Sequence, residues 1–349
     1  MIEIDGSFGE GGGQLLRYSA AIAALTGKDI KVYNIRAKRS NPGLRPQHLT
    51  ALKFIARLVD AETEGLRVGS TQIILKPRRK RPKGGRFTVD IGTAGSVTLF
   101  LQAVVPVLLA ADSEIELEVR GGTSVKWSPP YPYFENVLVP LFRKFGAKIE
   151  TKLVRRGFYP QGGGIVRIVV EPSYPLNPIN ITQTGEPGSI RGISYVGNLP
   201  CHIAERQYRA AKSYLESKGL KVEEIVRDCR TPAIGKGTGI VLWTNMAEGI
   251  VGSDSLGERG KPAEAVGREA AEKLFNIIKN GAPIDPHASD NLIIYMSLAN
   301  GMSQILTSEM TSHAKTALHL CSMIAGSEHS VSGVNGNILI KVKGIGLSP

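Results

Sequence analysis

Apolar stretches along the first 80 residues are interrupted at intervals by glycine, proline and polar residues. Gly27 is typical of a residue that ends a helix, and Pro46 is typical of one that begins a helix. The pattern predicts the order strand, helix, strand, helix, strand, strand. The predicted unit has an N-terminal strand over 1–4, helices over 13–25 and 46–60, and further strands over 30–35, 65–68 and 72–76.

The same order of elements recurs further along the chain, which indicates an internal repeat. The segments "ALTGKDIKVYNIRA" and "LAADSEIELEVRGG" take matching places in the first two units. A third unit is predicted to begin near Asp285. The second unit has predicted strands over 87–91, 114–120, 147–153 and 165–170 with helices over 95–110 and 133–145, and the third has helices over 290–299 and 313–325 and a last strand over 337–341.

Residues 181–282 differ from the repeat, and their pattern predicts a strand, a helix, three strands and a helix. The flanking segments "SYPLNPIN" and "KNGAPIDP" are rich in Pro, Asn and Gly, a composition typical of linkers. The sequence therefore predicts an α/β protein with layers of helices and sheets. Three β-α-β-α-β-β repeats form a large domain over 1–180 and 283–349, and a small α/β domain over 181–282 is inserted between repeats two and three.

The chain of 349 residues carries a formal net charge of +12, which favours a polyanionic partner such as a nucleic acid or a nucleotide. Cys201, Cys229 and Cys321 are scattered without a CxxC spacing, so we expect no disulfide framework, no zinc site and a reducing compartment. We expect no secretory signal, and the longest apolar run, residues 99–111, is too short to span a bilayer. The expected protein is cytoplasmic and has no membrane partner.

A glycine-rich loop, "SFGEGGGQLLR" over 7–17, joins the first strand to the first helix. The loop matches neither G-x-x-x-x-G-K-[ST] nor G-x-G-x-x-G with an acidic residue ending the next strand. One interpretation is a tight turn that needs glycine dihedrals. The other is functional: a glutamate beside bound phosphates would repel them unless a divalent cation lay between, so Glu10 is a candidate metal ligand.

Basic residues cluster in the first unit. Arg36 and Arg39 follow a strand and Arg17 lies on the preceding helix, which suits either bidentate phosphate binding or a solvated basic edge. Residues 76–86, "KPRRKRPKGGR", contain seven cations, and we expect a flexible, solvated hairpin, although the run could follow a nucleic-acid backbone. The segment "GKGTG" over 235–239 leads into a strand rather than a helix, so we interpret it as a hairpin turn.

Two histidines lie late in the chain. His313 falls where a helix of the third unit should begin, and a neutral imidazole can act there as a covalent nucleophile in nucleotidyl transfer. The alternative is an ordinary hydrogen-bonding histidine, and His319, six residues later and on another helix face, fits that role. "HASDNL" over 287–292 and "SPPYPYF" over 128–134 are polar or rigid loops whose rings could sandwich a base, or plain helix N-caps preceded by turns.

These residues together resemble the RNA 3'-terminal phosphate cyclase family. The matching segments are "DGSFGEGGGQLLR", "IRAKRSNPGLRPQHLTA", "GTAGSVTLFLQ", "GGT" followed by "PP", "RRGFYPQGGG" and "TSH". The resemblance covers essentially the whole length, and the ordered set is highly specific. It implies three β-α-β-α-β-β repeats with a small inserted α/β domain, in agreement with the pattern above.

The resemblance also implies an ATP-dependent reaction at an RNA 3'-phosphate end. ATP adenylates the Nε2 atom of a histidine, AMP passes to the RNA phosphate, and the neighbouring 2'-hydroxyl displaces AMP to leave a 2',3'-cyclic phosphate. The nucleophile falls on His313, and the ligand of a divalent metal, magnesium or manganese, falls on Glu10. Other residues around ATP fall on Arg17, Arg36 and Arg39 at the phosphates, on Gln102, and on Pro129 with His287, Ala288, Ser289, Asp290 and Asn291 at adenine, while Gln47 and His48 lie in a matching motif.

Some members of the family carry a tyrosine where this chain has His287 and a glutamine where it has Asn291, which leaves the nucleotide preference open. One alternative function is a non-catalytic ribosome-assembly scaffold of the same family, which would lack the histidine nucleophile. Another is a transferase of the enolpyruvyl type, built on a similar repeat. The inserted domain could contact RNA or form a homodimer.

Overall fold

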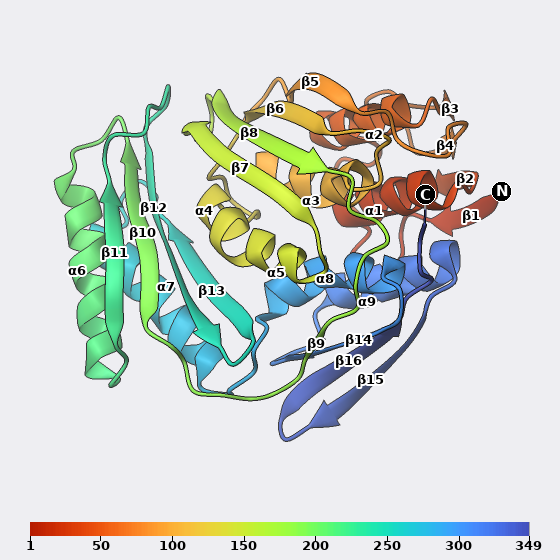
Figure 1. Ribbon diagram of the computed structural model, residues 1–349. Helices are drawn as coiled ribbons and strands as arrows, with labels where there is room; N and C mark the ends of the chain where they lie inside the picture. The colour runs from red at the N-terminus through yellow and green to blue at the C-terminus, as the bar shows by residue number, and fades with distance from the viewer. Residues whose placement is uncertain (349) are drawn as a thin grey trace.

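Three sheets of the protein share one strand order (Figure 1). A computed structural model describes residues 1–348 and places their strands in four four-stranded sheets. Three sheets have the orders β1-β2-β4-β3, β5-β6-β8-β7 and β9-β14-β16-β15, each with its first pair parallel and the other pairs antiparallel. The predicted α/β class is confirmed. The strands are β1 Ile2–Asp5, β2 Ile30–Tyr33, β3 Glu62–Glu64, β4 Ile73–Lys76, β5 Gly85–Asp90, β6 Ile115–Gly121, β7 Lys148–Arg155, β8 Gly164–Glu171, β9 Asn180–Ile181, β14 Met302–Thr307, β15 Glu328–Val334 and β16 Asn337–Lys343.

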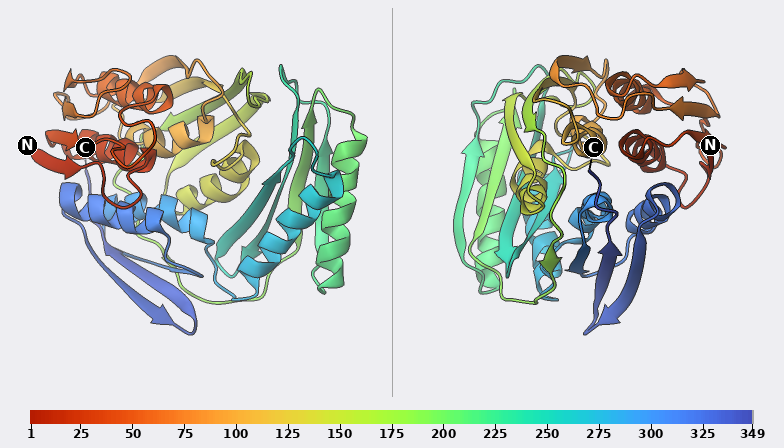
Figure 2. Two further views of the ribbon diagram at one scale, coloured as in Figure 1. Left: turned by 180° about the vertical axis from the view of Figure 1, so that it is seen from behind. Right: turned by 45° about the vertical axis from the view of Figure 1, so that its right-hand side comes forward.

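The helices that follow β1, β5 and β9 in these units form the centre of the large part of the molecule. They are α1 (Gly13–Thr26), α3 (Val97–Leu108) and α8 (Pro286–Leu298), and each is buried along nearly its whole length. Helices enclosed on all sides need apolar residues all round, which the sequence supplies. The right-hand view of Figure 2 shows them between the outer sheets, with the second helices, α2 (Pro46–Leu58) and α9 (Ser312–Leu320), alongside.

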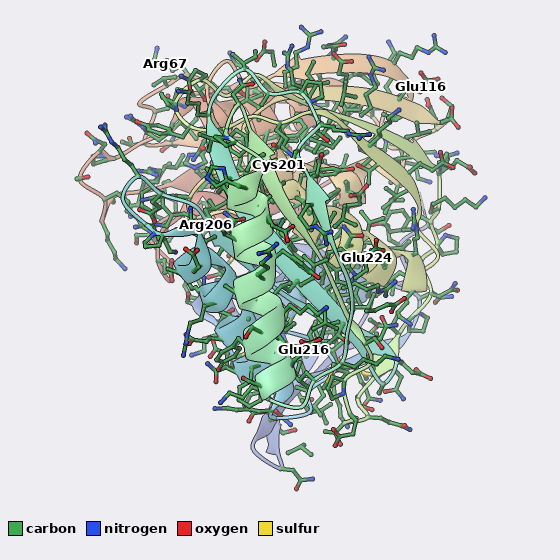
Figure 3. The ribbon with its side chains drawn as sticks, turned by 90° about the vertical axis from the view of Figure 1, so that its left-hand side faces the viewer. Arg67, Glu116, Cys201, Arg206, Glu216 and Glu224 are labelled. Carbon is green, nitrogen blue, oxygen red and sulfur yellow. A yellow bond between two sulfur atoms is a disulfide. The ribbon has the colours of Figure 1, made fainter. Side chains whose placement is uncertain are left out.

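The fourth sheet, with the order β11-β10-β12-β13, belongs to a stretch that we call the insert, residues 182–285. Helices α6 and α7 pack together against this sheet around a separate apolar cluster that includes Leu215, Leu242 and Leu274. Figure 2 (left) shows both helices on one face of the sheet, and Figure 3 shows α6 outermost, with Arg206 and Glu216 along it. The elements are β10 Ile190–Gly197, α6 His202–Ser217, β11 Val222–Asp228, β12 Gly237–Met246, β13 Gly249–Leu256 and α7 Ala263–Ile278.

The third unit begins earlier than its sequence pattern indicates. The sequence places its start near Asp285, whereas its sheet takes its first strand from β9, which pairs with β14 and precedes the insert. A strand of two residues carries no readable pattern. In the first unit, the strand expected over 65–68 is wrong, because β3 covers Glu62–Glu64 and 65–68 form a loop.

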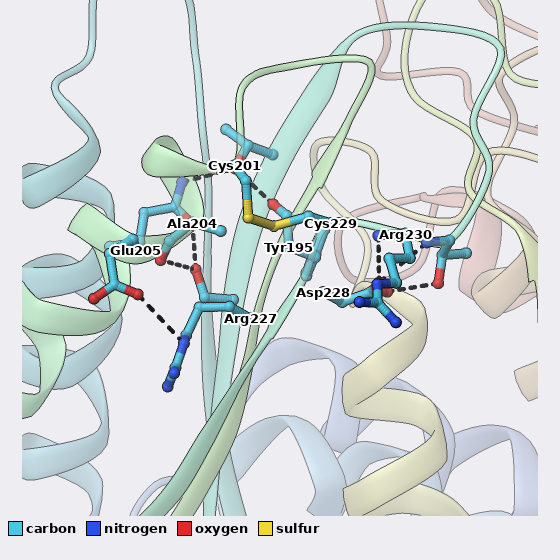
Figure 4. Close-up of a disulfide and its surroundings, with 12 residues drawn as sticks. Tyr195, Cys201, Ala204, Glu205, Arg227, Asp228, Cys229 and Arg230 are labelled. Atoms are coloured by element: carbon cyan, nitrogen blue, oxygen red, sulfur yellow. Dashed lines mark hydrogen bonds and ion pairs between the residues drawn. A yellow bond between two sulfur atoms is a disulfide. The ribbon is translucent and has the colours of Figure 1, made fainter.

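A disulfide joins Cys201 to Cys229, so the expectation of no disulfide framework is wrong (Figure 4). The sequence spacing gives no sign of the bond because it depends on the crossover β10-α6-β11. β10 and β11 are parallel neighbours, and therefore their carboxyl ends lie at the same edge of the sheet. Cys201 lies just before α6 and Cys229 just after β11, with their Cα atoms 5.5 Å apart.

The segment "GKGTG" is not a hairpin turn. β12 begins at Gly237, as expected for a segment leading into a strand, but β10 lies between β11 and β12 in the sheet. The chain therefore makes a longer connection between strands that are not neighbours. The hydrophobic pattern alone does not show which strands pair.

The basic run over 76–86 is not a hairpin, although Lys80, Lys83 and Arg86 are exposed to solvent as expected, and Arg78 and Arg79 pair with acidic side chains. Arg78 lies 3.0 Å from a Glu62 oxygen and 3.3 Å from an Asp29 oxygen. Arg79 forms an ion pair with Asp112. The run connects β4 to β5, which belong to different sheets, so its position is set by the packing of two units. Across residues 1–348, no helix is both long enough and apolar enough to cross a membrane.

Candidate active site

The glycine-rich loop and the start of α9 face each other. His313 is the second residue of α9, and its Nε2 atom lies 3.7 Å from Oε2 of Glu10. The Ser312 hydroxyl donates a hydrogen bond to Glu10, and Nε2 of Gln14 donates one to the His313 carbonyl oxygen over 3.2 Å. The prediction that a helix begins at His313 is confirmed to within one residue. Two segments at opposite ends of the chain therefore form one cluster.

Ring stacking and a glycine hold the loop against α9. The Phe8 ring stacks on the His319 ring with their centroids 4.0 Å apart, so His319 contributes packing rather than the hydrogen bonding expected of it. Gly9 has φ of 58°, and a Cβ there would lie 2.9 Å from Oγ1 of Thr316. A larger residue at this position would push the loop, and Glu10 with it, away from the helix.

A buried carboxyl group faces the other side of the His313 ring. Nδ1 of His313 lies 3.7 Å from Oδ2 of Asp290, which comes from α8. Thr311, the N-cap of α9, donates its hydroxyl proton to Asp290 and accepts a hydrogen bond from the Ala314 N–H over 2.9 Å. Burial raises the pKa of Asp290 to about 8, against the opposing effect of the Thr311 hydrogen bond. The imidazole thus lies between an exposed carboxylate and a buried carboxyl group.

Arg17 and His48 lie side by side in a positively charged, buried place. A Cβ at Gly13 would lie 2.3 Å from Nε2 of His48 and 2.7 Å from Nη1 of Arg17, so only glycine fits between them. Burial lowers the pKa of Arg17 to about 10. Burial, followed by the charges of Arg17, Arg36 and Arg45, lowers the pKa of His48 to about 3. Burial thus disfavours the charged forms of Arg17 and His48. A bound anion would stabilise these charged forms.

The other arginines lie nearby at different depths. Nη2 of Arg39 lies 3.9 Å from Oε2 of Glu10, so this exposed side chain reaches the cluster. Arg36 has φ of 54°, and its Nη2 donates to the Asn41 carbonyl oxygen over 3.4 Å. Burial and the neighbouring arginines lower the pKa of Arg36.

The helix predicted over 290–299 begins earlier, at Pro286, with Asp285 as its N-cap, so the expectation of a loop or an N-cap within 287–292 is wrong. Asp285 accepts hydrogen bonds from the Ala288 N–H and from the Tyr133 hydroxyl, both over 2.8 Å. The His287 ring packs edge-on to Tyr133 with their centroids 5.2 Å apart. Nδ2 of Asn291 donates to the His287 carbonyl oxygen, and Ala288 and Ser289 are fully buried.

A cavity of about 490 Å³ opens beside His287, between the insert and the rest of the molecule. Its volume is within the range of ordinary ligand pockets. Tyr133 and His287 contribute from one side, and Asp254 and Lys273 from the insert. Pro129 lies at the start of the segment that leads to Tyr133, and its carbonyl oxygen accepts a hydrogen bond from Thr98, one turn before Gln102 on α3.

Several buried polar atoms of these residues have no hydrogen-bond partner in the described chain. Buried polar groups are usually paired, so unpaired ones call for an explanation. A bound polar ligand would supply the missing partners. The atoms are Nε of Arg17, Nε of Arg36, Nδ1 of His48, Nε2 of Gln102 and Nε2 of His287.

Sequence reasoning missed four residues of this region: Gln14, Tyr133, Thr311 and Ser312. Thr311 could have been found, because threonine directly before a helix is a common N-cap. The contacts of the others depend on how distant segments pack. Of the predicted residues, the structure brings Glu10, Arg39, Asp290 and His313 into one cluster.

A family model described as RNA 3'-terminal phosphate cyclase matches residues 8–331. The chain belongs to the RNA 3'-terminal phosphate cyclase family. A relative named "RNA 3'-terminal phosphate cyclase" from Pyrobaculum neutrophilum is 46% identical over 346 residues, which are 99% of each chain. A relative of the same name from Methanopyrus kandleri is 48% identical over 321 residues, which are 90% of this chain and 91% of the relative. The family that the motifs resemble is thereby confirmed.

Proposed function

We propose that this cyclase-family protein converts an RNA 3'-terminal phosphate to a 2',3'-cyclic phosphodiester in an ATP-dependent reaction, through a covalent bond between AMP and His313. The observation that carries the proposal is the position of His313 at the start of α9, with Nε2 toward Glu10 and Nδ1 toward Asp290. The names of the relatives support the RNA substrate. The unpaired donors of Arg17, Gln102 and His287 support a polar ligand such as ATP.

His313 supplies the nucleophile in the first step. A proton on Nδ1, on the side of Asp290, leaves the lone pair on Nε2, on the side of Glu10. Nε2 attacks the α-phosphorus of ATP, a P–N bond forms, and the P–O bond to pyrophosphate breaks. The N-terminus of α9 and the guanidinium groups of Arg17 and Arg39 stabilise the charge on the phosphates.

Two further steps complete the reaction. An oxygen of the RNA 3'-phosphate attacks the α-phosphorus, and the P–N bond breaks, which restores His313. The 2'-hydroxyl then attacks the activated 3'-phosphorus and AMP leaves with the bridging oxygen. This last attack is intramolecular, so proximity provides a large part of the rate.

Glu10 is the residue that would hold a divalent cation. Its side chain is about half exposed, and no group of three His, Cys, Asp or Glu side chains within residues 1–348 could hold a metal alone. This fits Mg²⁺, which is commonly bound by one or two carboxylates together with substrate phosphates and water. When bound, such a cation neutralises negative charge on the phosphates.

Incubation with ATP labelled in the α-phosphate tests the nucleophile. We expect the protein to retain a label that is stable to alkali and lost in acid, as a P–N bond requires. The His313→Asn variant should lose the label, and the control His329→Asn, at an exposed histidine on β15, should keep it. Equal labelling of wild-type and His313→Asn proteins would show that the nucleophile is wrongly assigned, and no labelling of either would favour the scaffold.

A metal titration of the same labelling tests Glu10. We expect Glu10→Gln to raise the Mg²⁺ or Mn²⁺ concentration needed for half-maximal labelling by at least roughly tenfold, because an amide is a weaker cation ligand than a carboxylate. The control is Glu3→Gln, on β1, which should leave the titration unchanged. The ligand role is rejected if the Glu10→Gln and wild-type titrations coincide.

A further inference from the structure

Four loops meet where the sheet β5–β8 adjoins the insert, and we call their outer face the junction surface: residues 92–95, 122–130, 156–164 and 229–237. Backbone bridges pair Ser124 with Phe158 and Arg156 with Ala233. A Cβ at Gly162 would lie 2.7 Å from the Thr93 carbonyl oxygen, so the first and third loops also touch. Figure 1 shows this region at the top of the molecule, near the ends of β8 and β12.

Buried contacts hold these loops in place. Arg156 is 2% exposed, and its Nη2 donates to Asp228 over 2.6 Å. The Arg156 guanidinium carbon lies 4.0 Å from the centroid of the Tyr195 ring. The Tyr195 hydroxyl lies 2.9 Å from the Ser124 hydroxyl. A surface anchored in this way presents its outer side chains in a fixed arrangement, which lowers the entropy cost of binding.

The outer side chains are large, apolar and exposed. Trp127 is 96% exposed, Tyr159 is 78% exposed and Ile234 is 54% exposed. Trp127 also has φ of 61°, in the left-handed region that residues with a β-carbon seldom adopt. Exposed apolar side chains on loops that touch one another are typical of binding surfaces.

The charge of the junction surface selects the kind of partner. Lys126, Arg230 and Lys236 are exposed on two of the loops that form the junction surface. Lys126 pairs with Glu258 over 2.9 Å, while Arg230 and Lys236 form no ion pair with residues 1–348. Exposed rings interleaved with cations suit a single-stranded nucleic acid, whose bases stack on the rings and whose phosphates meet the cations.

Two loops of the junction surface contact segments that carry residues of the candidate active site. Trp127 lies two residues before Pro129, whose carbonyl oxygen is held by Thr98 at the start of α3. On the neighbouring loop, a Cβ at Gly95 would lie 3.2 Å from Cβ of Gln47, which precedes the buried His48. A strand bound on the surface would therefore lie next to the segments that carry Gln102 and His48.

We propose that Trp127 and Tyr159 stack on bases that precede the 3'-terminal nucleotide of a single-stranded RNA, with Arg230 and Lys236 at its phosphates. The inference rests on the proposed function, because it takes the RNA 3'-end as the ligand of the neighbouring site. It assigns the junction surface to substrate positioning. The stacking residues take no part in the bond-forming steps.

Tryptophan fluorescence gives a direct readout of stacking. The chain has two tryptophans, and Trp243 is only 8% exposed, so an accessible tryptophan signal reports on Trp127. We expect a single-stranded oligoribonucleotide with a 3'-phosphate to quench the fluorescence, and adenosine 3'-phosphate, which has no preceding base, to leave it unchanged. The Trp127→Phe variant should show no quenching.

Binding of a labelled oligoribonucleotide, followed by fluorescence anisotropy, tests the contribution to affinity. Loss of one stacked base predicts that Trp127→Ala and Tyr159→Ala each weaken RNA binding roughly tenfold, while Trp127→Phe keeps most of the affinity. Labelling of His313 by ATP should be unchanged in all three. Met302→Ala, at an exposed apolar residue on β14, is the matched control and should bind as wild-type does.

The outcomes separate this inference from the proposed function. Wild-type RNA affinity in the alanine variants would overturn the inference and leave the proposed function intact. The same result combined with loss of a dimer in sedimentation would assign the surface to self-association and also overturn it. Absence of ATP labelling and RNA cyclisation in the wild-type protein would overturn the proposed function. The anisotropy measurements would then still decide whether Trp127 and Tyr159 bind RNA.

Discussion

His48 shows how a single residue links the site to the stability of the fold. It is 2% exposed, and burial together with nearby arginines lowers its pKa to about 3. In the unfolded chain its pKa returns to about 6.5, so between these values the unfolded state binds a proton that the folded state does not. The contribution of neutral His48 to stability is therefore complete above about pH 6.5 and is lost as the pH falls below it.

Replacement of His48 by glutamine removes this titration. Between pH 7.5 and pH 5, we expect the wild-type free energy of unfolding to fall by about 2 kcal/mol more than that of His48→Gln. Denaturant unfolding at the two pH values measures the difference. His287, whose pKa burial lowers to about 4, is present in both proteins, so its effect cancels. Equal losses in the two proteins would contradict the buried neutral state of His48.

Sequence patterns identify some residues of the candidate site, but they do not predict the burial and contacts that other site residues acquire on folding. Glu10 and His313 lie in short motifs at a loop and a helix start, where the chemistry of one residue is readable. Arg17 reads as a helix-surface charge, yet it is buried because α1 is enclosed by the other units. Asp290 stands at the predicted start of a helix, but its position against Nδ1 of His313 depends on the packing of α8 on α9.

Among the elements, the crossover β10-α6-β11 is closed by the disulfide between Cys201 and Cys229. Closing this loop restricts the unfolded chain, so we expect the double variant Cys201→Ser, Cys229→Ser to lower the stability of the insert by about 3 kcal/mol. Hydrogen exchange of amides in α6 and β11 measures this locally. Dithiothreitol should accelerate exchange in the wild-type protein to the rate of the variant and leave the variant unchanged. Equal exchange in oxidised wild-type and variant would contradict a stabilising bond.

Element prediction succeeds where periodicity is long and fails where pairing decides the outcome. Helices such as α6 and α7 follow from their apolar spacing, and both are present where the sequence order predicts a helix. The two-residue β9 and the disulfide are invisible because each depends on a distant partner. The helix expected over 133–145 also contains a π-helical stretch, Phe134–Leu138, that no local pattern announces.

At the scale of the whole molecule, one buried ion pair connects the insert to the second unit. Burial opposes ionisation of Asp228, but hydrogen bonds from Thr231 and Arg156 outweigh it and lower its pKa to about 2. Asp228→Asn would remove the carboxylate to which the buried Arg156 guanidinium donates its hydrogen bond. We expect it to lower the free energy of unfolding by about 3 kcal/mol. Denaturant unfolding provides the measurement.

The control for this prediction is an exposed pair of the same chemistry. Arg206 and Glu264 lie 2.7 Å apart, and both are about half exposed. Since water screens such pairs, Glu264→Gln should lower the free energy of unfolding far less than Asp228→Asn does. If the two variants lose the same free energy of unfolding, the Arg156–Asp228 pair contributes no more to stability than an exposed pair does.

The net charge of +12 indicated a polyanionic partner, but sequence patterns could not predict how the insert packs against the second unit.

The shared strand order of the three units has a consequence for how this scaffold can diversify. In each unit, the connection from the first strand to the first helix leads to the N-terminus of a central helix. That connection is residues 6–12 in the first unit, 91–96 in the second and 182–285, a whole folded module, in the third. The backbone N–H of Gly185 donates to the Gly281 carbonyl oxygen over 3.3 Å, so the module leaves and re-enters at one point. The shared topology thus leaves these three connections free to differ in length, and a new module can be added at one of them without repacking the central helices.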